Sequence, residues 1–191
     1  MPIDKLDARA ALVLIDFQHG ILSLPLLHDR ATLLSNANVL VEAFHLRKMP
    51  VVFVRVNNIK LTRTDESPPS GWVVTPDYDQ FTDELAPSAE DHVATKHGWD
   101  AFYATDLDLT LRRNSVSQIV FAGIAASRGV ESSARSAQVR GYNVAFAVDA
   151  ISDLHQPSFD HSIGLIYPRL GQVETTEKIV VALKVAGAHA A

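Results

Sequence analysis

Short runs of consecutive apolar residues recur along the chain without alternating polar positions. The clearest are residues 10–15, 51–54, 118–123 and 143–148, and shorter runs lie at 92–95 and 172–174. A strand that is buried on both faces gives a run of this kind, and such strands belong to parallel sheets. The pattern therefore predicts five or six strands of a parallel sheet.

Helical periodicity separates these runs. Between residues 33 and 44, apolar residues recur at spacings of three and four, and Met49-Pro50 ends this helix because proline disfavours helical backbone at the residue before it. Gly141 and Thr176 are interpreted as a C-terminal and an N-terminal helix cap. Further helices are predicted for residues 106–113, 130–140, 158–170 and 177–183. Strands that alternate with helices predict an α/β fold, with three layers (α/β/α) and a parallel, Rossmann-like sheet of five or six strands.

Residues 57–91 interrupt the alternation. Pro68-Pro69-Ser70-Gly71 within this stretch is a loop signal. Long irregular connections are usually lids, binding loops or assembly arms, and the stretch shows no sign of a second domain. A length of 191 residues suits one domain, so residues 1–191 are predicted to form a single domain.

Composition narrows the class of protein. Hydrophobic residues make up 47% and charged residues 20%, which is ordinary for a globular protein, and the net charge of -5 argues against a nucleic-acid partner. No apolar run approaches the ~20 residues that span a bilayer. The first residues show no signal-peptide pattern, so a cytoplasmic protein with a small-molecule substrate is expected. The chain has no cysteine, which excludes disulfides and thiol catalysis.

Three segments with candidate chemistry fall at the carboxyl ends of predicted strands. Asp16 follows the first strand, Lys96 follows the third, and residues 123–129 join the fourth strand to the next helix. Ligands of open parallel sheets bind outside the carboxyl ends of the strands, so these segments are expected to share a pocket. A carboxylate beside an ammonium group could act as a general acid or base. Backbone N–H groups of the helix that begins near Gly129 could stabilise an oxyanion.

Each of these residues also has a purely structural interpretation. Asp16 could cap a turn, and Lys96 could be a solvated loop residue. Ser127 fits a helix N-cap better than a nucleophile, and Arg128 could bind an anionic substrate or face water. The shared position of Asp16 and Lys96 on one rim favours a functional role for that pair.

Four segments of the sequence resemble, in order, the isochorismatase-like hydrolases of the cysteine hydrolase superfamily. They are Ala-Leu-Val-Leu-Ile-Asp-Phe-Gln at 11–18, Lys-His-Gly-Trp-Asp-Ala-Phe at 96–102, Gly-Ile-Ala-Ala-Ser-Arg-Gly-Val-Glu-Ser-Ser-Ala-Arg at 123–135, and Ala-Phe-Ala-Val-Asp-Ala at 145–150. The resemblance runs from about residue 8 to residue 183. It implies a three-layer α/β/α fold, an Asp-Lys-Cys triad, and a homodimer or homotetramer.

The resemblance assigns Asp16 and Lys96 to the triad, whereas Gly129 stands where the cysteine usually lies. Amide hydrolysis through a thioester is therefore not expected. Nicotinamidases resemble one another in an Asp-x-His metal site after the second strand, but this chain has Asn57-Asn58-Ile59 in that region. No metal and no cofactor are predicted.

Isochorismatases also have glycine at the cysteine position, and they cleave a vinyl ether with an aspartate as general acid. This likeness implies that Asp16 donates the proton and that Lys96 orients it or binds the substrate carboxylate. It also implies a cis peptide between Ile124 and Ala125, with the N–H groups of Ala125 and Gly129 lining the pocket. The chain departs from isochorismatases at Ala125, where they have an aromatic residue, and at Ser127, where they have histidine.

Three hypotheses follow. The first is a hydrolase without a cysteine nucleophile that acts on a small carboxylate or an enol ether, with Asp16 as the acid. The second is an inactive family member that acts as a ligand-binding or scaffold protein. The third is a hydrolase that uses Ser127 or Ser132 as its nucleophile, with His97 as the base. Among the aromatic residues, Trp72, Trp99 and Phe102 could line the pocket, although Trp99 and Phe102 fit a core or interface position better.

Overall fold

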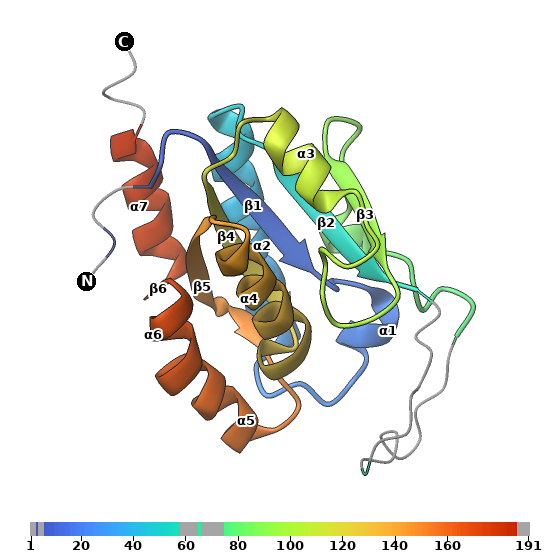
Figure 1. The fold of residues 1–191 in the computed structure, drawn as a ribbon. Helices are drawn as coiled ribbons and strands as arrows, with labels where there is room; N and C mark the ends of the chain where they lie inside the picture. Colours follow the sequence, from blue (N-terminus) through green and yellow to red (C-terminus); the bar gives the residue numbers. More distant parts are fainter. Residues whose placement is uncertain (1–2, 4–5, 58–64, 66–74, 187–191) are drawn as a thin grey trace.

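The described residues of the chain, 3, 6–57, 65 and 75–186, form a six-stranded parallel sheet between two layers of helices in a computed structural model (Figure 1). The strand order is β3-β2-β1-β4-β5-β6. The strands are β1 Ala10–Ile15, β2 Val51–Val56, β3 His92–Lys96, β4 Gln118–Ile124, β5 Asn143–Ser152 and β6 Gln172–Glu174. The predicted three-layer fold with a parallel sheet is confirmed.

Helices cover both faces of the sheet. One face packs against α2 (Arg30–Leu46) and α7 (Thr176–Ala186). The other face packs against α3 (Leu107–Arg113), α4 (Glu131–Val139), α5 (Gln156–His161) and α6 (Tyr167–Leu170). Figure 1 shows α3 and α4 in front of the sheet and α2 behind it. Two further short helical elements are α1 (His19–Leu22) after β1 and a 3-10 turn at Asp83–Leu85.

The central strand β1 explains why the sequence shows uninterrupted apolar runs. Leu12 and Leu14 belong to the core on the α2 side, whereas Val13 and Ile15 belong to the core on the α4 side. All six residues of β1 are buried. Because both faces of the strand are covered, no polar residue interrupts it.

Some predicted boundaries are wrong. The fifth strand continues four residues past Val148 to Ser152, after a register shift between β4 and β5. The helix predicted for 158–170 begins at Gln156, and a π-helical turn at Ser162–Ile166 divides it.

The prediction that Thr176 caps the last helix is also wrong. Thr176 donates its N–H and its hydroxyl to Asp149 Oδ1 at 2.7 and 2.8 Å. In the first turn of α7, Lys178 donates its N–H to the hydroxyl oxygen of Thr175 at 3.5 Å. A partner 27 residues away in sequence therefore takes both polar groups of Thr176.

The strand order reverses between β1 and β4, which is where open α/β sheets bind ligands. Here the backbones of the two strands approach closely. Gly123 in β4 has a φ of +132°, and a Cβ atom at this position would lie 2.1 Å from the carbonyl oxygen of Ile15. Asp16 follows Ile15 with a φ of +58°, in a left-handed region that residues other than glycine seldom adopt. The junction therefore requires glycine in β4 and turns the chain sharply at Asp16.

Part of the irregular stretch 57–91 lies outside the described residues, including Trp72. Its described end packs on the turn after β1 through an antiparallel bridge between Phe81 and Gln18. The N–H of Thr82 also donates to the carbonyl oxygen of Phe17 at 3.3 Å. This stretch is therefore joined to the segment that carries Asp16. Within the described part of the chain, no helix is long and apolar enough to cross a membrane.

We expect Gly123→Ala to lower the free energy of unfolding by more than about 3 kcal/mol, because the methyl group collides with backbone and the φ angle is unfavourable for alanine. Gly164→Ala is the matched control, since a Cβ atom there meets nothing within 4 Å. Urea denaturation followed by circular dichroism measures both variants. Equal stability of the two alanine variants would contradict the close approach of β1 and β4.

Candidate active site

Asp16 and Lys96 form a buried ion pair at the carboxyl ends of the strands. Lys96 Nζ donates to Asp16 Oδ2 at 2.8 Å, although 80 residues separate the two in sequence. Only 5% of Asp16 and 2% of Lys96 is exposed. The solvated-lysine and turn-cap interpretations are therefore wrong, because Lys96 is the last residue of β3 and its side chain meets the Asp16 carboxylate beyond the end of β1.

The ammonium group of Lys96 has acceptors for all three of its N–H donors. Besides Asp16, they are the carbonyl oxygens of Gly98 and Trp99, at 3.1 and 3.2 Å. A buried ammonium group is stable only when its donors are satisfied. The segment after β3 therefore folds back over Lys96 and holds its charge in place.

The carboxylate of Asp16 is only half satisfied. Its Oδ1 atom is buried and has no hydrogen-bond partner among the described residues. Burial raises the pKa of Asp16 from 3.8 to about 6, although the charge and hydrogen bond of Lys96 act in the opposite direction. Burial disfavours the ionised form, and the single ion pair compensates for it only in part. Asp16 consequently holds a proton to a higher pH than an ordinary aspartate does.

Gly129 faces the same ion pair from the segment after β4. A Cβ atom built on Gly129 would lie 3.3 Å from Lys96 Nζ and 3.0 Å from Cγ2 of Ile15. Gly129 belongs to a π-helical turn, Ala126–Val130, that precedes α4. The peptide between Ile124 and Ala125 is cis, as expected. The structure therefore brings Asp16, Lys96 and Gly129 together on one rim.

The start of α4 anchors the segment after β3. Ser133, which is fully buried, donates its hydroxyl to the carbonyl oxygen of Gly129 at 2.7 Å and accepts from the N–H of Ala101 at 2.9 Å. One turn later, Ser136 donates its hydroxyl to Asp100 Oδ2 at 2.7 Å. These bonds tie the segment that covers Lys96 to the turn that carries Gly129.

The buried carboxylate of Asp153, at the end of β5, holds the π-helical turn from the other side. Asp153 Oδ2 accepts from both the N–H and the hydroxyl of Ser127, each at 2.7 Å. The hydroxyl of Tyr167 donates to the carbonyl oxygen of Ala126 at 2.9 Å. The prediction that Ser127 is an N-cap is wrong, because its hydroxyl makes no cap hydrogen bond and donates to Asp153 instead.

Gln18 and Tyr78 attach the turn after β1 to the rest of the site. The amide of Gln18 is fully buried and pairs with both backbone groups of Val56, donating to its carbonyl oxygen at 2.9 Å and accepting from its N–H at 2.8 Å. The ring of Tyr78 occupies the space beside Gly20, where a Cβ atom would lie 1.9 Å from it. Burial and the negative charge of Asp16 raise the pKa of Tyr78 to about 12, so its hydroxyl stays neutral.

The geometry gives no support to Ser127 as a nucleophile with His97 as the base. The hydroxyl of Ser127 donates to Asp153, and Nδ1 of His97 lies 2.6 Å from the carbonyl oxygen of Asn57. Within the described ranges, no group of three or more His, Asp or Glu side chains is placed to hold a metal ion. The absence of a cofactor stays a prediction.

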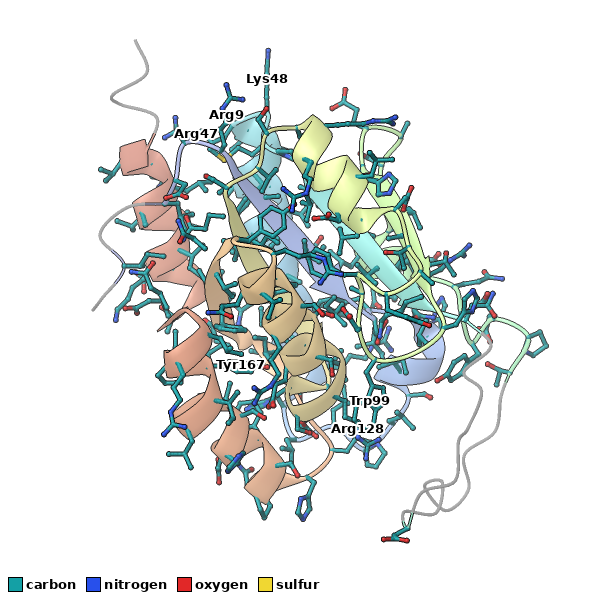
Figure 2. The ribbon with its side chains drawn as sticks, in the orientation of Figure 1. Arg9, Arg47, Lys48, Trp99, Arg128 and Tyr167 are labelled. Carbon is teal, nitrogen blue, oxygen red and sulfur yellow. The ribbon has the colours of Figure 1, made fainter. Side chains whose placement is uncertain are left out.

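The side chains of Arg128 and Trp99 lie next to each other (Figure 2). The guanidinium carbon of Arg128 is 5.8 Å from the centre of the Trp99 ring. Trp99 is 55% exposed and Phe102 is buried in the core. Phe102 therefore takes the predicted core position, whereas Trp99 is not a core residue and its interface position stays a prediction.

A surface hollow of about 420 Å³ lies beside the π-helical turn. It is lined by Ser127, Glu131, Pro157, Ser158, His161 and Ser162. These residues do not include Asp16 or Lys96, so the hollow does not contain the ion pair.

Comparison with known proteins identifies the family. A family model of the isochorismatase domain matches residues 10–178. The uncharacterized isochorismatase family protein YwoC of Bacillus subtilis is 35% identical over 182 residues, which cover 92% of this chain and 95% of that protein. YecD of Escherichia coli O157:H7, also described as an uncharacterized isochorismatase family protein, is 36% identical over 188 residues, 94% of this chain and 99% of that protein.

A solved structure of an isochorismatase family protein from Burkholderia thailandensis superimposes on this chain with a TM-score of 0.88. Its sequence is 38% identical, and the match covers 95% of this chain and 99% of that one. The chain therefore belongs to the isochorismatase family, as a hydrolase of that class without cysteine. The oligomeric state and the cellular location stay predictions.

We expect Lys96→Met to destabilise the fold by roughly 3–5 kcal/mol at pH 8, because Asp16 is left ionised and unpaired in the core. The folded-state pKa of Asp16, already raised to about 6, should rise further. For a group whose pKa is raised by folding, stability is present at low pH and is lost as the pH rises through the folded-state pKa. The loss should therefore be smaller at pH 5 than at pH 8, as measured by urea denaturation.

Two further variants test this explanation. The double variant Asp16→Asn/Lys96→Met should recover most of the lost stability, because it removes the unpaired charge. Arg30→Met, which breaks an exposed pair with Glu84, should change stability by no more than about 1 kcal/mol. A loss in Lys96→Met that is the same at both pH values would show that packing, and not the charge of Asp16, causes it.

Proposed function

We propose that the protein hydrolyses a small carboxylate or enol-ether substrate without a protein nucleophile, with Asp16 as the general acid. The state of the Asp16 carboxyl group carries this proposal. The group is buried, its pKa is raised to about 6, and its Oδ1 has no hydrogen-bond partner among the described residues. A carboxyl group with a pKa near the working pH is an effective proton donor. Lys96 binds the other oxygen, so the proton resides on Oδ1.

The reaction needs no bond between the protein and the substrate. Protonated Asp16 transfers its proton to the terminal carbon of the vinyl ether, and the ether oxygen stabilises the resulting cation. Water adds to the cation, and the hemiketal that forms divides into a ketone and an alcohol. Asp16 recovers a proton when the added water loses one. Every step is compatible with glycine at position 129, where no side chain can attack.

The remaining site residues have supporting roles in this proposal. Lys96 orients Asp16 and favours a carboxylate substrate through its positive charge. Backbone N–H groups of Ala125 and Gly129 bind substrate oxygen, and Ser127 and Arg128 are assigned to substrate binding next to them. Asp153 and Ser133, which no motif in the sequence indicates, position this segment through the hydrogen bonds described above.

The alternative is a family member without activity that binds a ligand or a partner. The same pocket would then bind a small carboxylate, and Asp16→Asn would change only the affinity. Asp16 is buried and incompletely hydrogen-bonded, which costs stability and favours a chemical role over a purely structural one.

Turnover of isochorismate, beside a panel of small amides, tests the proposal. Asp16→Asn should lower the rate of ether cleavage by roughly 10²- to 10⁴-fold, because the amide cannot donate the proton. Asparagine can still accept from Lys96, so the fold should be kept. Asp160→Asn on the exposed face of α5 is the control, with unchanged turnover expected. Wild-type protein that turns over neither isochorismate nor any amide would contradict the proposal and favour a binding protein.

The pH dependence gives an independent test. The acid must be protonated, so kcat/KM should be level below pH 6 and should fall tenfold per unit above the Asp16 pKa of about 6. A stopped assay of ether cleavage between pH 4.5 and 8.5 measures this profile. Activity that rises through pH 6 would instead assign Asp16 the role of a base.

A serine nucleophile should be absent. A fluorophosphonate probe should leave the wild-type protein unlabelled, because the Ser127 hydroxyl donates to a carboxylate that also fixes the turn. Ser127→Ala and Ser132→Ala should each lower turnover by no more than about tenfold. Replacing a nucleophile would lower turnover far more. If the wild-type protein is labelled and one of these variants is not, that serine is the nucleophile and the proposed role of Asp16 is wrong.

A further inference from the structure

A second hollow, of about 560 Å³, lies at the end of the sheet opposite to Asp16. Gln118, Asn143 and Gln172, the first residues of β4, β5 and β6, line it, whereas Asp16 follows the carboxyl end of β1. Its polar and aromatic lining residues include Asp7, Gln118, Gln138, Tyr142, Asn143 and Gln172. Small-molecule sites have volumes of about 300–1,000 Å³. This amino-end hollow is therefore large enough for a ligand of its own.

Gln118 directs an unused amide nitrogen into this hollow. Only 3% of the residue is exposed, and its Oε1 accepts from the N–H of Asp7 at 2.7 Å, which fixes the orientation of the amide. Its Nε2 donates to no side chain or carbonyl oxygen of the described residues. Asp16 Oδ1 is the one enclosed side-chain atom without a partner in that part of the chain, so Gln118 Nε2 is not enclosed. The buried side chain therefore presents its two N–H donors to the hollow that it lines.

Asp7 offers an acceptor on the wall of the same hollow. Its Oδ2 accepts from the hydroxyl of Ser117 at 2.8 Å and from the amide of Asn143 at 3.0 Å. These two bonds hold the carboxylate in place, while Oδ1 accepts from no group in the described ranges. A fixed acceptor and a fixed pair of donors therefore border one space, and the hydrogen bond from Asp7 to Gln118 joins them.

The rest of the lining is neutral. Gln138 and Gln172 add carboxamide groups, which donate and accept, and their side chains make no hydrogen bonds with described residues. Val144 and Leu170 add apolar side chains. Apart from Asp7, none of the residues that line the hollow is charged. The hollow therefore suits a neutral ligand with both polar and apolar parts.

We propose that the amino-end hollow binds a neutral cyclic polyol, which is a sugar or a cyclitol. A hydroxyl group both donates and accepts, so one ligand can satisfy Gln118 Nε2 and Asp7 Oδ1 together. An anion is repelled by the Asp7 carboxylate, and an ammonium group cannot accept from Gln118. The C–H groups of the ring pack against Val144 and Leu170. This site is separate from the Asp16 site and does not depend on the function proposed for it.

Titrations of the ¹⁵N-labelled protein test the ligand class. The probes are D-glucose, myo-inositol, myo-inositol 1-phosphate and cyclohexanol, which keeps the ring but has a single hydroxyl group. At least one of the two neutral polyols should shift the side-chain amide signals of Gln118, with a dissociation constant of about 5 mM or tighter. The tighter of the two identifies the ligand as a sugar or a cyclitol. Cyclohexanol and the phosphate should each bind at least about tenfold more weakly, because one lacks hydrogen-bonding groups and the other meets Asp7.

Variants assign the binding to the residues. Gln118→Glu keeps the acceptor for Asp7 and loses the amide donors, so polyol affinity should fall at least about fivefold, read from the backbone signals of Gly141 and Gly171. Gln138→Ala, which breaks no hydrogen bond among the described residues, should lower it about two- to fivefold. Asp7→Asn should strengthen binding of the phosphate at least about threefold, since it removes the repulsion.

Gln156→Ala is the matched control, because Gln156 is a glutamine in α5 that does not line the hollow. This control and Asp16→Asn should bind the polyol as the wild-type protein does. No shift of the Gln118 amide with either polyol up to about 20 mM would overturn the proposal and indicate that water alone occupies the hollow. Equal binding of cyclohexanol would overturn the polyol specificity, and full polyol affinity in both Gln118→Glu and Gln138→Ala would place the binding elsewhere and overturn the site.

Discussion

A lysine and an aspartate that meet away from water place the strictest demand on this fold. Separating either charge from solvent is unfavourable, and the attraction between the two repays that cost only when geometry and hydrogen bonding are good. Two carbonyl oxygens complete the set of acceptors around Lys96, and they come from a segment that must fold back over its own strand. Ser133 and Ser136 hold that segment, and Asp153 holds the facing turn. Much of the polar bonding at this end of the sheet therefore serves to keep one ion pair in position.

Within this ion pair, only Asp16 has incomplete hydrogen bonding. Lys96 satisfies one carboxylate oxygen and leaves the other without a partner in the described part of the chain. A fully paired carboxylate would have a depressed pKa and would give up its proton well below neutral pH. Incomplete pairing combined with burial has the opposite effect. The same feature that weakens the ion pair as a stabilising contact makes Asp16 suitable for proton transfer.

The sequence was sufficient to predict the sheet, because strands buried on both faces leave uninterrupted apolar runs. The proximity of Asp16 and Lys96 also followed from topology, since carboxyl ends of parallel strands share one edge. Asp153, Ser133 and Gln18 were not predicted. Their partners lie 26, 32 and 38 residues away and leave no periodic signal in the sequence. Ser127 and Thr176 were assigned to local caps for the same reason, because a distant carboxylate competes with the nearby backbone for each hydroxyl group. The exposure of Trp99 depends on which side of the segment after β3 faces Lys96. The sequence gives no sign of this orientation.

Glycine at position 129 has a consequence for the conditions under which the protein can act. A thiolate nucleophile is vulnerable to peroxide, to disulfide formation and to alkylating compounds, because reactivity toward a substrate and reactivity toward an oxidant come from the same lone pair. A carboxylic acid has no such weakness, and this chain has no cysteine elsewhere to be modified. Under the proposed mechanism with Asp16 as the acid, oxidative stress that inactivates thiol-dependent hydrolases would leave the reaction intact.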